Sequence, residues 1–335
     1  MLKSRLAVTG IYILVILCVL GVGIFVRVSS LLSHAHISFT DLSAPLPKSS
    51  NAQGAYTFLF LGVGGGDHEG PNLTDTIMLA KYVPSSNTLT TLGLPRDLWD
   101  EGTKDKINAI YTYALQQKEV DPYAYVKVNF LRVTGLAIDH VVIVDFSTFQ
   151  EVIDLLGGIT ITNDIGFVDD QYPIEGAENK DCVPYDPNYS CRYETVSFPT
   201  GKLQMNGAVA LKYVRSRHSS GDEGTDFSRS NRQQRVIQAI STKLAEIIKN
   251  RDVSTLEDLV SLLDSRIKRT LSNRDAVALV RTILMSRNQI KIVSNKIGLE
   301  YFDVPPLSEY EDRYVLLPPH KDYENLKQQL SKLLP

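Results

Sequence analysis

Cysteine and histidine are scarce in this chain, with 3 cysteines and 6 histidines among 335 residues. Cys18 lies in an apolar run, so only Cys182 and Cys191 remain, inside the segment DCVPYDPNYSC. Two cysteines are too few for a structural zinc site, which takes four ligands, and no H-E-x-x-H spacing occurs. The pair instead predicts a disulfide that closes a short loop in an oxidising compartment, worth on the order of 2–3 kcal/mol.

An excess of positive charge is also absent, because the formal net charge is −3 and the isoelectric point is near 6.1. A general nucleic-acid-binding domain would be basic, so we expect no nucleic-acid partner. Ser216 and Ser219 lie in no G-x-S-x-G motif, which argues against a serine hydrolase. The glycine-rich loop at 62–66 lacks the G-x-x-x-x-G-K-[ST] pattern of nucleotide-binding loops.

One apolar run, at residues 6–26, is long enough to cross a bilayer as a helix. Lys3 and Arg5 precede it, which predicts that residues 1–5 stay in the cytoplasm and that the rest of the chain lies outside. A cleaved signal peptide is the alternative, but the run is longer than a usual signal sequence and no A-x-A site follows. We therefore expect a single-pass protein of the cell membrane.

Beyond the predicted anchor, polar and Ser-rich residues 27–54 predict a stalk, and residues 55–335 predict one extracytoplasmic domain. Strand-like and helix-like segments alternate there, which indicates an α/β domain of α-β-α type with a central mixed sheet. Apolar periodicity predicts strands over 56–63, 73–83, 88–94, 140–146 and 159–162, with short strands near 290–303 and 313–317. It predicts helices over 106–117, 123–137, 149–158, 228–250, about 254–264 and 273–286. Residues 164–200 are expected to form an irregular insertion.

Five arginines gather between Leu211 and Arg235, on both sides of a Gly/Ser/Asp-rich loop. Arg229, Arg232 and Gln233 are spaced to lie together in the first turn of the following helix. Cations are disfavoured at a helix N-terminus, and a bound phosphate or diphosphate would resolve that conflict. The alternative is a solvated basic helix start, partly offset by the nearby acidic residues Asp222, Glu223 and Asp226.

Five motifs, in this order, resemble those of the LytR–CpsA–Psr family of bacterial cell-wall glycopolymer ligases: LGVGGGDHEGPNLTDTIMLA, GLPRDLW, DKINAIY, VDFSTFQEVIDLLGGI and the arginine stretch. The resemblance covers about residues 55–250. It implies a membrane-anchored extracytoplasmic domain that holds a polyprenyl-diphosphate-linked glycan, with the lipid in an apolar groove and the diphosphate between arginines. It also implies Mg²⁺-assisted transfer of the glycan, as a phosphosugar, to peptidoglycan or another wall acceptor.

The resemblance implies roles for individual residues. Asp75, in T-D-T where the family has S-D-T, matches a magnesium ligand, and Asp75, Arg96 and Arg217 are expected to act in catalysis. The positions that match diphosphate-binding residues are Arg96, Lys106, Arg215, Arg217, Arg229, Arg232 and Gln233. Without the resemblance, Asp75 is interpreted as a strand-end cap, and the alternatives are a surface ion pair with Asp97 for Arg96 and a solvated lysine at a helix start for Lys106.

The chain departs from the family pattern in two places. Gly64 and Gly65 stand where many members have an Asp-Arg pair, and Leu73 stands where many have an arginine. We hypothesise that Asp67 supplies the missing carboxylate as a second metal ligand. The departures also keep two other functions open, namely a non-catalytic polyprenyl-(di)phosphate-binding module and a diphosphatase acting on the same lipid. A second carboxylate near Asp75 would favour the enzymes.

Overall fold

The computed structural model describes residues 38–335, apart from 39, 52–53, 67–69, 178–179, 184–185, 220, 225, 251, 287–289 and 296. The predicted membrane span at 6–26 lies outside this range. No helix among the described residues is long and apolar enough to cross a membrane.

A six-stranded mixed sheet forms the centre of the domain, in the order β11-β6-β1-β2-β3-β12. Its strands are β1 (Tyr56–Val63), β2 (Thr74–Val83), β3 (Thr88–Leu94), β6 (His140–Asp145), β11 (Lys268–Arg269) and β12 (Lys291–Asn295). The neighbouring pairs β1–β2, β2–β3 and β11–β6 are antiparallel, whereas β6 runs parallel to β1 and β12 runs parallel to β3. The predicted α/β class and mixed sheet are confirmed.

Side chains of β1 and β2 alternate between two covered faces. Leu59 and Leu79 point into the main core, whereas Phe60 and its cross-strand neighbour Met78 line a cavity on the opposite face. Apolar residues therefore occupy both the even and the odd positions of these strands. Such continuous hydrophobic runs are typical of a sheet that is covered on both sides.

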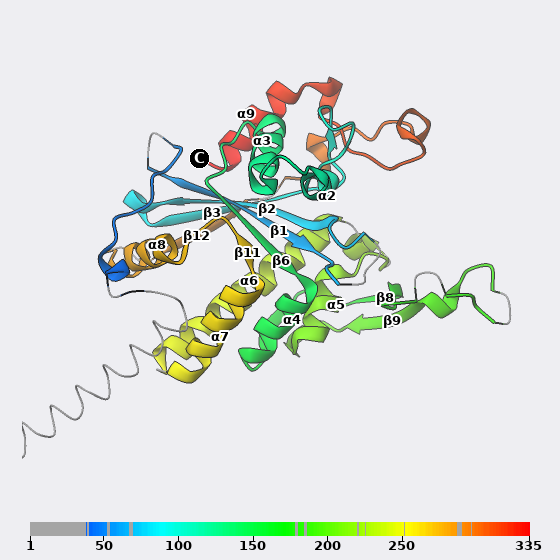
Figure 1. Ribbon diagram of the computed structural model, residues 1–335. Helices are drawn as coiled ribbons and strands as arrows, with labels where there is room; N and C mark the ends of the chain where they lie inside the picture. Colours follow the sequence, from blue (N-terminus) through cyan, green and yellow to red (C-terminus); the bar gives the residue numbers. More distant parts are fainter. Residues whose placement is uncertain are drawn as a thin grey trace, which may run out of the picture.

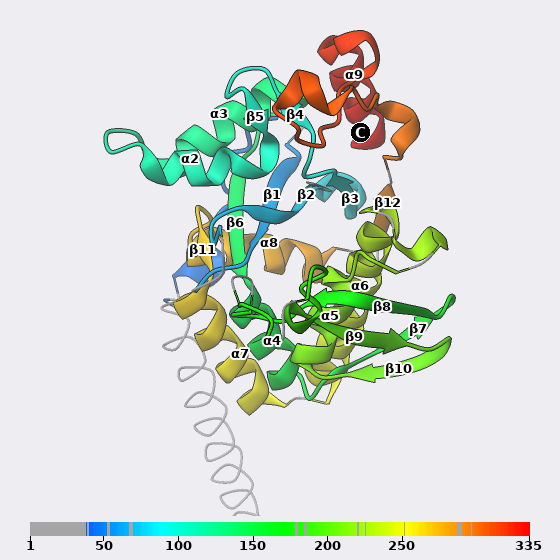
Figure 2. The same cartoon turned by 90° about the vertical axis from the view of Figure 1, so that its right-hand side faces the viewer.

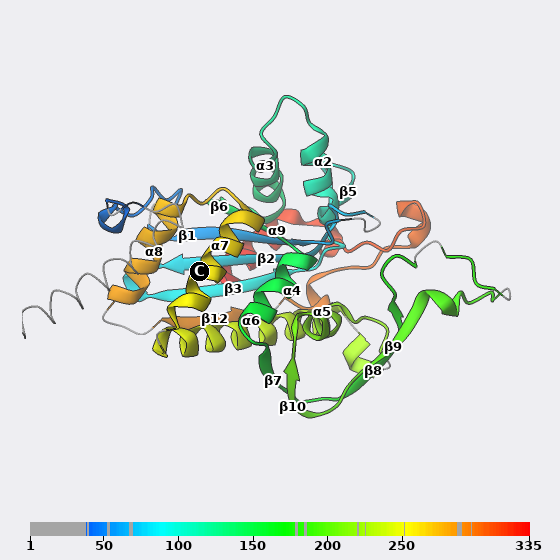
Figure 3. The ribbon, with the colours of Figure 1, turned by 60° about the horizontal axis from the view of Figure 1, so that its bottom comes forward.

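Helices cover each face of the sheet (Figures 1 and 3). One face carries α2 (Ile110–Gln116), α3 (Pro122–Thr134) and α9 (Tyr323–Leu333), whose apolar side chains complete the main core. The other face carries α4 (Phe146–Leu155), α5 (Gly207–Arg215), α6 (Asp226–Lys249), α7 (Val253–Arg266) and α8 (Asn273–Met285). The shorter elements are β4 (Trp99–Asp100), β5 (Asp105–Lys106), and the 3-10 helices η1 (Asp41–Ser43), η2 (Pro84–Ser86), η3 (Ile107–Ala109), η4 (Ser190–Arg192), η5 (Gly221–Gly224), η6 (Leu299–Tyr301), η7 (Leu307–Tyr310) and η8 (Pro319–Lys321).

Two small antiparallel pairs lie beside the main sheet (Figure 2), and they correct two predictions. The strand predicted at 159–162 forms, as β7 (Ile159–Asn163), but it pairs with β10 (Gly201–Met205) rather than joining the central sheet. The segment 164–200 contains a hairpin of β8 (Phe167–Pro173) and β9 (Tyr193–Phe198) instead of being irregular throughout. Phe167, Phe198 and Tyr213 pack together with ring centroids 5.1–5.9 Å apart, and this aromatic cluster holds the hairpin against α5.

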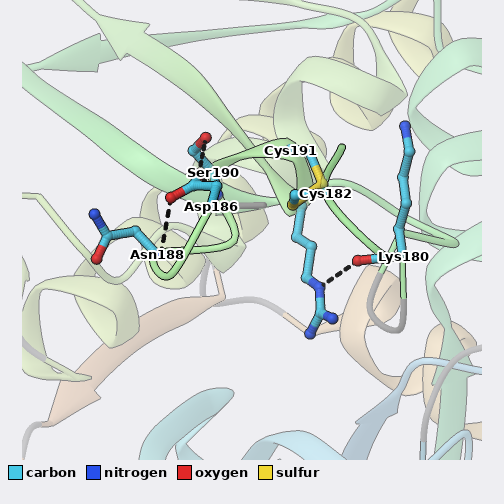
Figure 4. Close-up of a disulfide and its surroundings, with 7 residues drawn as sticks. Lys180, Cys182, Asp186, Asn188, Ser190 and Cys191 are labelled. Atoms are coloured by element: carbon cyan, nitrogen blue, oxygen red, sulfur yellow. Dashed lines mark hydrogen bonds between the residues drawn. A yellow bond between two sulfur atoms is a disulfide. The ribbon is translucent and has the colours of Figure 1, made fainter. Parts of the chain in front are cut away.

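The strand expected near 313–317 is reduced to isolated bridges, in which Leu316 pairs with Leu98 and Leu317 with Asp303. The predicted disulfide is present, since Cys182 and Cys191 are bonded, with their Cα atoms 5.7 Å apart. Figure 4 shows this disulfide beside a turn in which the Asp186 carboxylate accepts hydrogen bonds from the Asn188 and Ser190 backbones.

Candidate functional site

An apolar cavity of about 590 Å³ lies between the sheet and the helices of its second face, and we call it the groove. Its floor is made of the cavity-facing side chains Phe58, Phe60, Met78, Ala80 and Tyr82. From Thr76 to Tyr82 the floor follows β2 over seven residues, about 20 Å at the rise of a strand. Its walls include Phe146 and Phe149 of α4, Val236 and Ile237 of α6, and Leu279 and Ile283 of α8.

The two ends of the groove differ in chemistry. At one end, which we call the polar end, the lining residues are Asp75, Arg96, Arg215, Arg217, Arg229 and Gln233. At the other, the apolar end, they are Tyr82, Leu89, Leu279, Ile283 and Ile290. The polar end lies where β1 finishes and β2 begins, because Gly62 pairs with Thr76 there, and the apolar end lies where β2 finishes.

A second cavity, of about 380 Å³, adjoins the polar end. It shares with the groove the five residues Asp75, Thr76, Arg217, Arg229 and Gln233. Its remaining walls include Pro95 after β3, Leu299 and Tyr314. A molecule with an anionic centre and two arms could therefore place the centre at the shared residues and one arm in each cavity.

Asp75 and Arg96 form an ion pair at this junction, with the Arg96 Nη1 donating to Asp75 Oδ1. Arg96 Nε lies 3.6 Å from Asp97 Oδ2, and this buried nitrogen makes no hydrogen bond with the described residues. An unsatisfied buried donor is the kind of group that a bound anion satisfies. The pair of Arg96 and Asp97 expected as an alternative thus exists, but Arg96 also reaches the groove.

The first turns of α6 bring two of the predicted residues to the junction. Arg229 is only 7% exposed, and its Nη2 donates to the Asp75 carbonyl oxygen at 3.1 Å. Gln233 Nε2 donates to Thr76 Oγ1 at 2.9 Å. Because the two residues are four apart on the helix, both side chains face β2. The predicted proximity of Arg229 and Gln233 is confirmed.

Arg215 and Arg217 reach the groove from the end of α5. The Arg215 guanidinium lies 4.3 Å from the ring centroid of Phe146 and 5.8 Å from that of Tyr172, as in cation–π contacts. Arg217 follows the end of the helix and lines both cavities. The two sides of the arginine stretch therefore converge on one end of the groove, as its sequence predicts.

Asp169, to which the sequence assigns no role, fixes the backbone around Arg217. It is fully buried, and its Oδ2 accepts hydrogen bonds from the Ser216 hydroxyl at 2.6 Å and from the Arg217 N–H at 2.9 Å. Burial alone raises the pKa of Asp169, but hydrogen bonds from Ser216, His218, Arg217 and Gln171 outweigh it and hold the pKa below its ordinary value. Asp169 is thus an ionised anchor for the loop that presents Arg217.

Arg232 is placed differently from the prediction. Its side chain is fully buried and lines neither cavity. Its guanidinium donates to the carbonyl oxygens of Tyr213, Glu223 and Ser216 and pairs with the Glu223 carboxylate at 2.8 Å. These contacts hold the arginine-bearing loop onto α6, so Arg232 takes a structural role rather than the diphosphate contact expected from its spacing.

Lys106 also stays away from both cavities, because its Nζ pairs with Asp97 Oδ1 at 2.7 Å. It holds Asp97, the neighbour of Arg96, instead of facing a ligand directly. Arg235 pairs with Asp164 at 2.8 Å. Of the residues predicted to bind the diphosphate, Lys106 and Arg232 therefore do not line the groove, and the other five do: Arg96, Arg215, Arg217, Arg229 and Gln233.

Asp145 is a second carboxylate at the polar end that the sequence reasoning missed. It closes β6, lines the groove, and caps α4 by accepting from the Thr148 N–H at 2.8 Å. A side chain at position 65 would put its Cβ 2.8 Å from the Asp145 Cβ, so Gly65, at φ +69°, leaves room for this carboxylate. The signal was available, since residues at the carboxyl ends of adjacent parallel strands often bind ligands.

The carboxylates of Asp75 and Asp145 suit a magnesium ion whose coordination shell is completed by a bound ligand and water. Mg²⁺ takes one or two carboxylates, with phosphate oxygens and water as its other ligands. Asp75 and Asp145 can supply carboxylates at the polar end, whereas no group of three or more His, Cys, Asp or Glu in the described part of the chain could hold a metal. The predicted second ligand Asp67 lies outside the described residues.

The fold and the site together define a class of protein: an α/β domain with an apolar groove that ends in a cluster of arginines, suited to an amphiphile with an anionic head. The LytR_cpsA_psr family matches residues 30–332, and the chain belongs to that family.

Relatives with known names and structures agree with this assignment. The TagU protein of Bacillus subtilis (strain 168), named a polyisoprenyl-teichoic acid–peptidoglycan teichoic acid transferase, is 29% identical over 281 residues, 81% of this chain and 79% of TagU. The Enterococcus faecalis protein of that name is 24% identical over 79% of this chain and 78% of its own length. The crystal structure of B. subtilis TagU shares the fold, with a TM-score of 0.53 and 22% identity over 84% of this chain and 97% of that one. The structure of TagT bound to LIIa-WTA shares the fold with a TM-score of 0.55 and 20% identity, over 86% of this chain and 94% of that one.

Proposed function

We propose that this protein transfers a glycopolymer from a polyprenyl-diphosphate carrier to a cell-wall acceptor such as peptidoglycan. The names of its relatives support transfer, and the junction between the two cavities is the observation that carries the proposal. The apolar groove suits a polyprenyl tail, the shared residues suit a diphosphate, and the second cavity suits the sugar that follows it. Exposed Tyr314 in that cavity offers an aromatic surface for a sugar.

In the proposed reaction an acceptor hydroxyl attacks the phosphorus next to the sugar. The new bond joins the acceptor oxygen to that phosphorus. The bond between the same phosphorus and the oxygen that bridges the two phosphates breaks, and polyprenyl phosphate leaves with the bridging oxygen. The hydroxyl proton passes to a general base beside the acceptor. The product is a phosphodiester between the glycan and the acceptor.

The arginines supply what this reaction needs most. Negative charge builds on the departing lipid phosphate, so positioning and electrostatic stabilisation dominate such transfers. Arg217 and Arg229 touch both cavities and so can hold the two phosphates of the diphosphate, while Arg96 and Arg215 face the groove. Charge-assisted hydrogen bonds from planar guanidinium groups fit phosphate oxygens well.

Magnesium is part of the proposal. Asp75 would hold Mg²⁺, with Asp145 as a second carboxylate, and the bound ion would neutralise diphosphate charge. Arg96 pairs with Asp75 through one carboxylate oxygen, which keeps Asp75 at the junction of the cavities.

A lipid-binding module without catalysis is the second candidate. The engagement of Asp75 by Arg96 and the glycines at positions 64 and 65 favour it, because both reduce the carboxylates and cations available for chemistry. A diphosphatase would use the same groove with water as the acceptor.

One experiment separates these functions. The full-length protein is incubated with a polyprenyl-diphosphate-linked glycan, with or without peptidoglycan, and with Mg²⁺ or a chelator. Mass spectrometry then quantifies polyprenyl phosphate and the glycan–peptidoglycan phosphodiester. Equal amounts of both products, formed only with acceptor, support the transferase. Polyprenyl phosphate without acceptor indicates a diphosphatase, and bound but unchanged lipid indicates the binding module.

A further inference from the structure

The chain enters the domain at the apolar end of the groove. The 3-10 helix η1 packs against α8, and just after it Arg281 Nη2 donates to the carbonyl oxygen of the buried Ala44 at 2.6 Å. The hydroxyl of Tyr56, at the start of β1, donates to the Pro47 carbonyl at 2.7 Å. Figures 1 and 3 show η1 and α8 together at one end of the sheet. The same helix places Leu279 and Ile283 in the groove.

The elements that form this end, namely the segment after η1, α8 and residues 290–292, carry apolar side chains that face solvent. We call them the apolar rim: Leu46, Val280, Met285, Ile290 and Ile292. Met285, at the end of α8, is 77% exposed, and Val280 and Ile292 are each 53% exposed. Ile292 pairs with Leu89, a residue of the apolar end, so the rim continues directly from the groove.

Single exposed apolar residues are ordinary on a protein surface, but a group of them around the mouth of an apolar groove is not. What lies beyond the described residues indicates what covers the rim. Residues 27–37 connect the predicted membrane span to Ser38, and fully extended they reach at most about 40 Å. The end of the domain that carries η1 and the rim is therefore the end tethered closest to the bilayer.

We propose that the apolar rim rests on the surface of the phospholipid bilayer, with the apolar end of the groove opening toward the acyl chains and the polar end about 20 Å above it. A lipid tail then enters the groove from the bilayer without crossing water. Exposed Lys291, between Ile290 and Ile292, would face phosphate head groups. Amphipathic surfaces dock in this way when apolar side chains enter the head-group region and basic ones stay above it. This orientation holds whether the protein transfers, hydrolyses or only binds the lipid.

The test measures the depth of the rim in a membrane with the full-length protein. In a Cys18→Ser background, Met285→Cys carries a nitrobenzoxadiazole label, and the protein is reconstituted into vesicles of phosphatidylcholine and phosphatidylglycerol. The Cys182–Cys191 disulfide leaves no other thiol to label. Lipids with a doxyl quencher near the head group should quench the Met285→Cys label at least threefold more than a label at Leu307→Cys.

Leu307 is the matched control because it is 46% exposed and belongs to η7, whose Tyr310 packs against Trp99 near the polar end. Adding Val280→Asp and Ile292→Asp should lower the quenching at position 285 toward the control value while thermal unfolding stays cooperative. Equal quenching at 285 and 307 would overturn the proposal. Crosslinked dimers in which the label at position 285 is not quenched by lipid would also overturn it, because the rim would then be covered by a second copy of the protein.

Discussion

Arg229 donates a hydrogen bond from Nη2 to the carbonyl oxygen of Asp75, 3.1 Å away, and thereby joins α6 to β2 where the two cavities meet. The contact joins the buried Arg229 to the backbone of a residue whose carboxylate is itself paired with Arg96. Arginines and the carboxylates of Asp75 and Asp145 therefore line the same end of the groove.

Arg217→Ala should weaken binding of polyprenyl diphosphate by tenfold or more, because a charge-assisted hydrogen bond is worth roughly 1.5–3 kcal/mol. Lipid retention measured by native mass spectrometry gives the affinity. Arg235→Ala is the matched control, since Arg235 belongs to the same stretch but pairs with Asp164 outside both cavities. If both variants retain lipid as well as the wild type, the arginine cluster is not a diphosphate site.

Substitutions of the carboxylates Asp75 and Asp145 should change the response to Mg²⁺. Asp75→Asn is expected to abolish the Mg²⁺ dependence of turnover or lipid retention, and Asp145→Asn to shift the half-saturating Mg²⁺ concentration upward by several-fold, because hard cations need anionic oxygen ligands. Asp67→Asn tests the ligand predicted from sequence. An unchanged metal titration in Asp75→Asn would contradict the magnesium role, and an unchanged one in Asp67→Asn would discard Asp67.

Asp169→Asn should destabilise the fold by roughly 2–4 kcal/mol at neutral pH, because it removes a buried anion that accepts several hydrogen bonds. The pKa of Asp169 is depressed in the folded protein, so its stabilising contribution is fully present above the unfolded value near 3.9 and is lost as the pH falls through the lower folded pKa. The gap in unfolding free energy between wild type and variant should therefore shrink between about pH 5 and pH 2.

Urea denaturation across that range measures the gap, with Asp170→Asn as the control because Asp170 is exposed on the same strand. A gap that does not change with pH would show that Asp169 is not held ionised by its donors. Asp169→Asn should also lower the affinity for lipid at neutral pH, because Asp169 positions the backbone of Arg217. Lowering the temperature should not restore this affinity.

Arg232→Ala should act on stability rather than on the ligand. Truncation leaves the Glu223 carboxylate and three carbonyl oxygens without their partner, and breaking a buried pair of this kind costs roughly 3–5 kcal/mol. Thermal unfolding should show a clear drop in Tm. At a temperature where the variant is folded, unchanged lipid affinity is expected, and a stable variant that has lost lipid binding would instead support the clamp role inferred from sequence.

The contrast between Arg229 and Arg232 shows what periodicity can and cannot predict. The spacing of three and four residues correctly indicates that Arg229, Arg232 and Gln233 share one side of α6. Which part of that side faces the cavity depends on how the loop around Glu223 folds back, and that loop is a tertiary feature. A single sequence therefore groups these residues but does not separate a ligand contact from a buried support.

Strands were predicted best where the chain supplies both an apolar run and a clear stop. β1 and β3 begin and end at the predicted residues, because a glycine loop follows one and Pro95 follows the other. The hairpin of β8 and β9 was missed since half of β8 is polar and a long turn separates its strands. Asp169 was missed for a related reason: one acidic residue in a strand carries no pattern until its neighbours are placed. Asp145 differs, because its position at the end of a predicted strand was a signal.

The most direct test of the account is a crystal structure of the protein with a short-chain polyprenyl diphosphate and Mg²⁺. We predict that the chain lies along β2 between Phe60 and the helices, and that phosphate oxygens lie about 3 Å from the guanidinium groups of Arg217 and Arg229. A diphosphate bound at the apolar end, or outside the junction of the two cavities, would show that the arginines at the junction are not the diphosphate site.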